Sequence, residues 1–168
     1  MPLKPKKSLG QNFLHDKNII NKIIDASKIC SNDEVLEIGP GTGNLTNFII
    51  SQKPKKIYVI EKDENLSNDL EKKFLNQIKV IKKDILKIPS EFYLGKKFLI
   101  LGNLPYNIST KILSNWCLNN KLNVSRMILM FQKEVADRIL ANVNSKEYSR
   151  ITILSKWKYD IKKVTDVK

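Results

Sequence analysis

Short apolar runs alternate with amphipathic helical patterns along most of this 168-residue chain, and this alternation constrains the fold most. The predicted strands are 34–38, 56–60, 79–82, 98–101, 126–131 and 150–159. The predicted helices are 16–30, 44–51, 65–75, 109–119 and 133–142. Strands separated by helices form βαβ units, so the sequence predicts an α/β fold, a mostly parallel sheet with helices on both faces. The fully apolar run 98–101 is expected to lie mid-sheet.

Polar or turn-forming residues follow four of these strands directly. They are the glycine-rich turn 39–43, Glu61, Asp84 and the segment 103–106. In open parallel sheets, ligands bind beyond the carboxyl ends of the strands, so we expect these residues to share one site.

The glycine turn has the spacing Gly39-x-Gly41-x-Gly43, with Asn44 where a dinucleotide fingerprint needs its last glycine. This looser turn suits a nucleoside ligand without a pyrophosphate, although a glycine turn can also be only a tight turn. Glu61 is placed to accept the ribose hydroxyls of an adenosine, or it is an exposed acid paired with a lysine. Asp84 is placed to accept an adenine amino group, or it caps a turn. Together the three features predict an adenosine-type cofactor.

The segment Asn103-Leu104-Pro105-Tyr106 is the sharpest chemical signal. An exocyclic amine on a base is a poor nucleophile, because its lone pair is delocalised into the ring. The Asn103 side-chain oxygen and a backbone carbonyl near Leu104 or Pro105 can accept its two N–H groups and direct the lone pair at a methyl donor. Tyr106 offers a face on which the base can stack. The alternative is a proline turn with a structural tyrosine.

Charge and composition add weaker constraints. The net charge is +13, which favours polyanions such as RNA, but only three of the 30 basic residues are Arg, a profile that an A+T-rich genome also produces. Cys30 and Cys117 match no metal or redox spacing and are expected to be reduced core thiols. His15 is expected to be structural or exposed, and no metal cluster can be assembled. No apolar run approaches the ~18–20 residues of a membrane helix, and no secretory signal is present, so the protein is expected in the cytoplasm.

Six stretches of the chain together resemble the ribosomal RNA adenine dimethyltransferases of the KsgA/RsmA type. The matching stretches are LGQNFL (9–14), EIGPGTGNLT (37–46), IEKD (60–63), Asp84, GNLPYNIST (102–110) and MFQKEVADRI (130–139). The resemblance implies a class I methyltransferase, Rossmann-like fold, with S-adenosyl-L-methionine as donor and S-adenosyl-L-homocysteine as product. The implied substrate is small-subunit ribosomal RNA in an immature ribosomal subunit, with two adjacent adenosines near the 3′ end dimethylated at N6. The similar large-subunit methyltransferases of macrolide resistance match less well at NLPYN and FQKEVADR.

The resemblance also implies roles for individual residues. The implied catalytic residues are Asn103, Pro105, Tyr106 and Phe131, the last as a second stacking face for the flipped base. The implied cofactor-binding residues are Asn12, Leu14, Gly39, Gly41, Glu61, Asp84, Ile85 and Asn103. Residues 1–15 are expected to form an N-terminal cap over the cofactor, within a single domain of residues 1–168.

The family pattern continues beyond Lys168 to a seventh strand, which lies between strands five and six, and to a helical C-terminal domain. We therefore expect an incomplete sheet and no helical C-terminal domain in these 168 residues. The protein is also expected to act as a monomer. One alternative function remains open, a basic RNA-binding ribosome-assembly factor whose methyl transfer is incidental or lost. An NAD-dependent oxidoreductase is disfavoured, because the glycine spacing and a hydride-transfer acid are both missing.

Overall fold

The computed structural model describes residues 14–167, which form a five-stranded parallel sheet of order β3-β2-β1-β4-β5. The strands are β1 (Glu34–Ile38), β2 (Lys56–Glu61), β3 (Lys79–Lys82), β4 (Lys97–Asn103) and β5 (Asn123–Met130). The α-helices are α1 (Lys17–Ser27), α2 (Asn44–Ser51), α3 (Glu64–Phe74), α4 (Ser109–Leu118), α5 (Lys133–Leu140) and α6 (Arg150–Lys158). Short 3-10 turns are η2 (Leu75–Gln77), η3 (Ile85–Lys87) and η4 (Ser90–Tyr93). The predicted α/β fold is confirmed.

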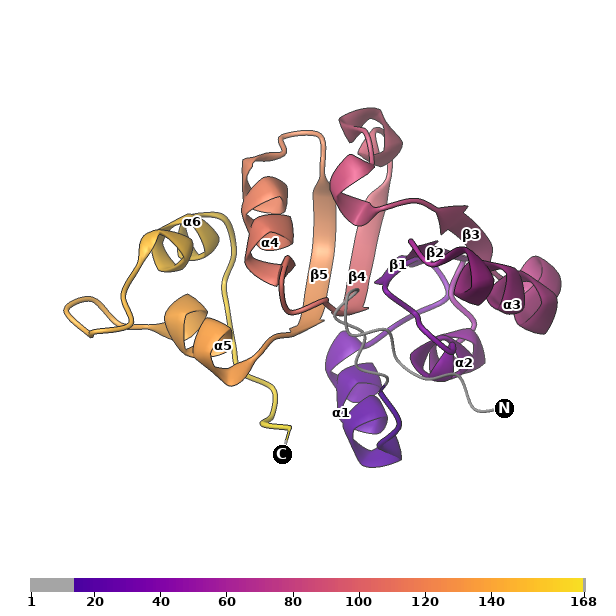
Figure 1. Cartoon of the computed structure of the whole chain (residues 1–168), viewed down its shortest axis with the longest axis horizontal. Helices are drawn as coiled ribbons and strands as arrows, with labels where there is room; N and C mark the ends of the chain where they lie inside the picture. The colour runs from indigo at the N-terminus through magenta and orange to yellow at the C-terminus, as the bar shows by residue number, and fades with distance from the viewer. Residues whose placement is uncertain (1–13, 168) are drawn as a thin grey trace.

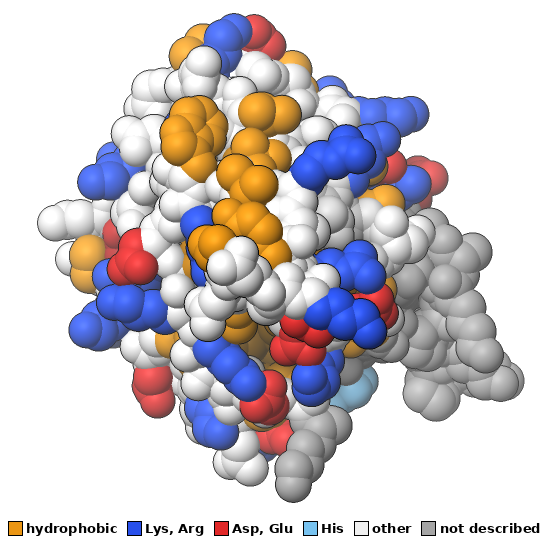
Figure 2. Space-filling view, turned by 90° about the vertical axis from the view of Figure 1, so that its left-hand side faces the viewer, with side chains coloured by type: hydrophobic (Ala, Val, Ile, Leu, Met, Phe, Trp, Pro, Cys, Tyr) orange, Lys and Arg blue, Asp and Glu red, His pale blue; other side chains and the backbone are white. Residues whose placement is uncertain are grey.

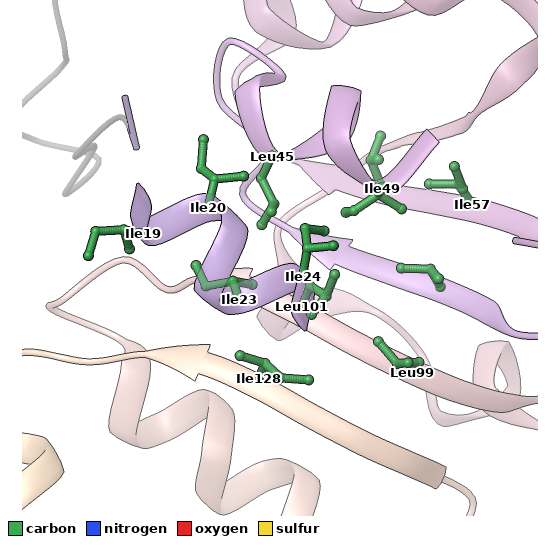
Figure 3. Packing of buried hydrophobic residues seen from close by; sticks show 12 residues of the cluster. Ile19, Ile20, Ile23, Ile24, Leu45, Ile49, Ile57, Leu99, Leu101 and Ile128 are labelled. Atoms are coloured by element: carbon green, nitrogen blue, oxygen red, sulfur yellow. The ribbon is translucent and has the colours of Figure 1, made fainter. Parts of the chain in front are cut away.

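Side chains alternate between the two faces of the sheet and build two separate cores. On one face, α1 and α2 cover strand residues such as Val35, Val59 and Leu99 (Figure 3). On the other face, Leu36 and Ile100 pack beneath α4 and the η3–η4 segment. Strand β4 lies between β1 and β5, as its apolar sequence predicted, because both of its faces are covered.

The prediction of a strand at 150–159 is wrong, because this segment forms helix α6. The alternating Ile151 and Ile153 favoured a strand, yet the buried side of the segment follows helical spacing and includes two hydroxyl residues, Thr152 and Ser155. The Ser155 hydroxyl donates to the Ile151 carbonyl at 2.6 Å, and the Ser149 N–H donates to the Thr152 hydroxyl at 3.0 Å, where the helix begins. Satisfied hydroxyls thus form a buried helix face that a hydrophobic pattern does not register.

Helices α5 and α6 lie beside α4 at the β5 end of the sheet, away from β3 (Figure 1). Leu113, Cys117, Ile139 and Ile151 form a third small core between these helices. Figure 2 views this end of the molecule, where a stripe of hydrophobic side chains lies among lysines. Ile153 and Trp157 on α6 are more than half exposed. Within residues 14–167, none of the helices is both long and apolar enough to cross a membrane.

Two smaller expectations at the first helix need correction. Helix α1 begins after its predicted cap Asp16 but ends at Ser27, since Lys28 adopts a left-handed conformation with φ of 47°. Cys30 therefore lies beyond the helix and is exposed, whereas only Cys117 is the buried thiol that was expected of both.

Candidate active site

The glycine turn begins directly after β1 and has three residues with left-handed backbone. Gly39, Gly41 and Gly43 have φ of 64°, 57° and 78°. Residues other than glycine rarely adopt this left-handed region. A Cβ on Gly43 would lie 2.5 Å from the ring of Phe74, so this glycine lets the turn pack against α3. A Cβ on Gly39 would lie 3.5 Å from the Asn103 carbonyl oxygen. The glycine turn and the NLPY segment are therefore immediate neighbours.

Glu61 ends β2 and is buried, so the alternative of an exposed acid paired with a lysine is wrong. One carboxylate oxygen accepts the Gly41 N–H at 3.3 Å, and the other accepts the N–H groups of Lys62 and Asp63, each at 2.9 Å. Burial raises the pKa of Glu61, while these backbone hydrogen bonds lower it in part. The carboxylate thus joins the glycine turn to the turn after β2.

Asp84 follows β3 and lies beside this pair of turns, because Glu61 and Lys82 are register partners. Its Oδ1 accepts the Leu86 N–H at 3.0 Å, so Asp84 caps η3, as the alternative interpretation expected. Its Oδ2 accepts from the Lys62 ammonium at 2.9 Å. Capping and ligand binding are compatible, since each carboxylate oxygen has more than one lone pair.

Ile85 lies on η3 and packs against the core beneath α4. It also lines a cavity of about 470 Å³ between the η3–η4 segment and α4, whose other walls include Ile112, Asn115 and Trp116. Among the predicted cofactor residues that the structure describes, Ile85 alone lines this cavity. The predicted adenine side of the site therefore adjoins open space along α4.

The NLPY segment is a tight turn between β4 and α4. The Ile108 N–H donates to the Pro105 carbonyl at 3.1 Å, and the Ser109 hydroxyl donates to the Tyr106 carbonyl at 3.3 Å. Leu104 anchors the turn in the core at 1% exposure, while Asn103, Pro105 and Tyr106 are half-buried. The turn is fixed by its backbone, and its polar and aromatic side chains remain accessible.

Phe131 directly follows β5, whose last residue Met130 is the register partner of Asn103. The strand register therefore brings Phe131 to the same edge of the sheet as the NLPY turn. Phe131 is partly buried and packs between the core beneath α4 and the small core of α5 and α6. The predicted catalytic residues Asn103, Pro105, Tyr106 and Phe131 thus share one region.

Leu14 and His15 are the described residues of the predicted N-terminal cap, whereas Asn12 lies outside the described residues. The Asn44 side-chain amide donates to the Leu14 carbonyl at 2.8 Å and lies 3.0 Å from Nδ1 of His15. Asn44 is the first residue of α2, immediately after Gly43. It therefore joins the N-terminal segment to the glycine turn, a role that the glycine spacing alone did not reveal.

Glu37 is a third carboxylate in the region of the site, and pattern reasoning missed it. It is completely buried between β1 and α2, where it accepts the Thr46 hydroxyl at 2.7 Å. Burial raises the pKa of Glu37 to about 7, the Thr46 hydrogen bond lowers it, and the charge of Glu61 raises it further. Its place between Leu36 and Ile38 in a buried strand was the available signal, because a buried acid is rare without a partner.

No group of three His, Cys, Asp or Glu side chains able to hold a metal ion occurs within the described part of the chain. The candidate site comprises a glycine turn after β1, acids after β2 and β3, and an amide–aromatic turn after β4, which lies on the other side of β1 from β2.

Dinucleotide-binding sheets share this strand order, but the similarity to solved RNA methyltransferase structures shows that the fold is of the class I methyltransferase type. The model of the family described as "Ribosomal RNA adenine dimethylase" matches residues 3–168. The chain therefore belongs to the ribosomal RNA adenine dimethylase family.

Individual relatives agree with this family. The chain is 52% identical to the "Ribosomal RNA small subunit methyltransferase A" of Pelagibacter ubique, over 100% of this chain and 64% of the relative. The protein of the same description from Malacoplasma penetrans is 41% identical over 96% of this chain and 58% of its own length. The crystal structure of a dimethyladenosine transferase from Plasmodium falciparum has a TM-score of 0.75 at 37% identity, covering 86% of this chain and 52% of that one. The chain thus spans less than two thirds of these relatives.

Proposed function

We propose that residues 1–168 form the cofactor-binding, catalytic domain of an enzyme that dimethylates RNA adenosines. The substrate is small-subunit ribosomal RNA in an immature ribosomal subunit, and the targets are N6 of two adjacent adenosines near its 3′ end. The family of the chain and the printed descriptions of its relatives support this assignment. The enzyme would work as a monomer in the cytoplasm, where small ribosomal subunits mature, and would not bind a membrane.

The described residues fit S-adenosyl-L-methionine. Gly39 has a left-handed backbone that favours glycine, and a Cβ there would lie in contact with the Asn103 carbonyl oxygen at 3.5 Å. Glu61 would hold the ribose hydroxyls, because its buried carboxylate ends the strand next to this turn. Asp84 and Ile85 would hold the adenine, Leu14 would close over the cofactor, and Gly41 and Asn103 would line the methionine side. When bound, the donor supplies an electrophilic methyl group on a sulfonium centre and leaves as S-adenosyl-L-homocysteine.

Asn103 would orient the attacking amine. Its side-chain oxygen accepts one N–H of the adenine amino group, and the carbonyl of Leu104 or Pro105 accepts the other. The nitrogen lone pair is then directed toward the donor on the Gly39 side. A strong base is unnecessary, because the amino proton becomes acidic as the new N–C bond forms. Positioning of this kind can contribute about 7–11 kcal/mol to lowering a barrier.

Tyr106 and Phe131 would hold the target base. An adenine inside a helix is stacked, so it must swing out before its amino group reaches the site. Aromatic stacking contributes about 1–3 kcal/mol per base. Both aromatic residues lie at the edge of the sheet that carries Asn103.

The single observation that carries the proposal is the close approach of Gly39 to the Asn103 carbonyl, since a Cβ there would lie 3.5 Å away. It brings the predicted donor turn beside the predicted amine-orienting turn. The test is titration calorimetry with S-adenosyl-L-methionine, followed by mass spectrometry of undermethylated small ribosomal subunits incubated with protein and donor. We expect binding and N6-dimethyladenosine at two adjacent positions; absence of donor binding contradicts the proposal.

A binding function is the second candidate. The net charge of +13 would suit an RNA-binding assembly factor, because RNA is a polyanion. Calorimetry distinguishes the enzyme from the assembly factor. An assembly factor without methyl chemistry would bind ribosomal RNA but would not bind S-adenosyl-L-methionine.

A further inference from the structure

Lys62 and Asp84 form an ion pair across the ends of β2 and β3, with 2.9 Å between Nζ and Oδ2. The Lys62 side chain is 59% exposed and that of Asp84 only 16% exposed. Lys62 directly follows Glu61, so the ammonium group reaches from the predicted ribose side to the predicted adenine side. The family resemblance implies no role for Lys62 itself.

The Asp84 carboxylate is held at both oxygens. Leu86 donates its N–H to Oδ1, and Lys62 donates to Oδ2. Burial opposes ionisation of Asp84, but the hydrogen bonds from Lys62 and Leu86, with the charges of Lys62 and Lys87, lower its pKa overall. An ionised carboxylate is an acceptor only, whereas a protonated one can also donate.

We propose that Lys62 is a positioning residue that makes the cofactor site selective for a 6-aminopurine. Its ammonium group fixes the orientation of the Asp84 carboxylate through Oδ2, so that the carboxylate is placed to accept from the exocyclic amine of adenine. A 6-oxopurine has an oxygen at that position. This oxygen is a hydrogen-bond acceptor and would face the carboxylate of Asp84, which is also an acceptor. The inference rests on the proposed function and deepens its adenine subsite.

Fold stability alone does not account for the pair. The Lys62 side chain is mostly exposed, and ion pairs that water reaches in this way contribute little to stability, typically about 0–1 kcal/mol. Lys82 offers a matched comparison, because it ends the neighbouring strand and pairs with Glu71 at 2.8 Å and with Asn68 instead of Asp84. Two lysines of equal charge thus lie near the same edge of the sheet, and only Lys62 contacts the predicted adenine acceptor.

The test uses two probes, S-adenosyl-L-homocysteine and its deaminated analogue S-inosyl-L-homocysteine, titrated calorimetrically. Lys62→Met keeps the apolar stem and removes the ammonium group. We expect it to lower adenosyl affinity about tenfold, the change that loss of one charge-assisted hydrogen bond network produces. Inosyl affinity should change little, so the adenosyl-to-inosyl ratio falls. Lys62→Arg, which keeps a positive charge, should retain the adenosyl-to-inosyl affinity ratio of the unaltered protein. Lys82→Met should also leave this ratio unchanged.

Two results would overturn the inference in distinguishable ways. If the unaltered protein binds the adenosyl probe and Lys62→Met keeps the full ratio, Lys62 has no part in selectivity while the proposed cofactor stands. If the unaltered protein binds neither probe, the proposed cofactor fails and this inference fails with it.

Discussion

The Glu61 carboxylate accepts the Gly41 N–H at 3.3 Å, so the side chain proposed to hold the ribose also fixes the glycine turn. Its second oxygen accepts the N–H groups of Lys62 and Asp63. One buried acid therefore organises both turns that flank the cofactor, and its loss should affect binding and local structure together.

Glu61→Ala is expected to weaken binding of S-adenosyl-L-methionine by about 1–3 kcal/mol, because ribose hydroxyls and three backbone N–H groups lose their charged acceptor. Calorimetry measures the affinity, and circular dichroism checks that the variant is folded. Glu64→Ala, an exposed acid on the first turn of α3, is the control and should bind normally. Unchanged affinity in a folded Glu61→Ala protein would refute the ribose assignment.

The ends of the strands were predictable from two strong local signals, an apolar run and the glycine or polar residue that follows it. Apolar runs such as 34–38 and 98–101 ended at glycine or polar residues, and parallel topology then required Gly39, Glu61, Asp84 and Asn103 to share one edge. The site could therefore be assembled before any distance was known.

The contacts that stabilise the site were not predictable from pattern. Lys62 and Asn44 act through side-chain hydrogen bonds to residues 22 and 30 positions away, which no periodicity encodes. The strand prediction for 150–159 was wrong for a related reason. Thr152 and Ser155 are buried because their hydroxyl groups donate hydrogen bonds to backbone carbonyls. Polar groups that are buried through hydrogen bonds carry no hydrophobic signal, whether the partner is local, as for Ser155, or distant, as for Thr152.

Asn44→Ala tests the connection between the N-terminal segment and the glycine turn. The variant loses the 2.8 Å hydrogen bond to the Leu14 carbonyl and the contact with His15. We expect donor affinity to fall by about 1 kcal/mol, the net contribution of a hydrogen bond, with little change in melting temperature. Asn47→Ala, an exposed position of α2, serves as the control. Equal affinities for the two variants would show that this connection is irrelevant to the donor.

Glu37→Gln tests the buried carboxylate beneath the glycine turn. The pKa of Glu37 is raised from 4.5 to about 7, so the folded state binds this proton more tightly than the unfolded chain does. The resulting stabilisation is complete below pH 4.5 and is lost as pH rises through about 7; the shift corresponds to about 3 kcal/mol.

Urea unfolding of the Glu37→Gln variant and the unaltered protein at several pH values measures this effect. We expect the unaltered protein to lose stability relative to the variant between pH 4.5 and 8, since the introduced amide does not titrate and can still accept the Thr46 hydroxyl. Glu147→Gln, at an exposed loop position, should follow the unaltered protein. A pH-independent difference between Glu37→Gln and the unaltered protein would mean that Glu37 does not titrate in this range.

Substitutions at the NLPY turn separate chemistry from binding. Asn103 is proposed to orient the amino group, an interaction that matters most in the transition state. Asn103→Ala should therefore lower the methylation rate by orders of magnitude while RNA affinity stays nearly intact, with some loss of donor affinity because Asn103 borders the Gly39 turn. Single-turnover methylation of undermethylated small subunits measures the rate, and near-normal turnover would exclude the amine-orienting mechanism.

Tyr106 provides the complementary test, because its ring and its hydroxyl can be removed separately. Tyr106→Phe keeps the stacking face and should be mild, whereas Tyr106→Ala removes stacking worth about 1–3 kcal/mol and should be severe. The Ser109 bond to the Tyr106 backbone carbonyl is available in both variants, so the turn itself should persist. Both variants are compared by methylation rate and by affinity for the RNA substrate. Equal damage from the two substitutions would identify the hydroxyl, and not the ring face, as the functional group.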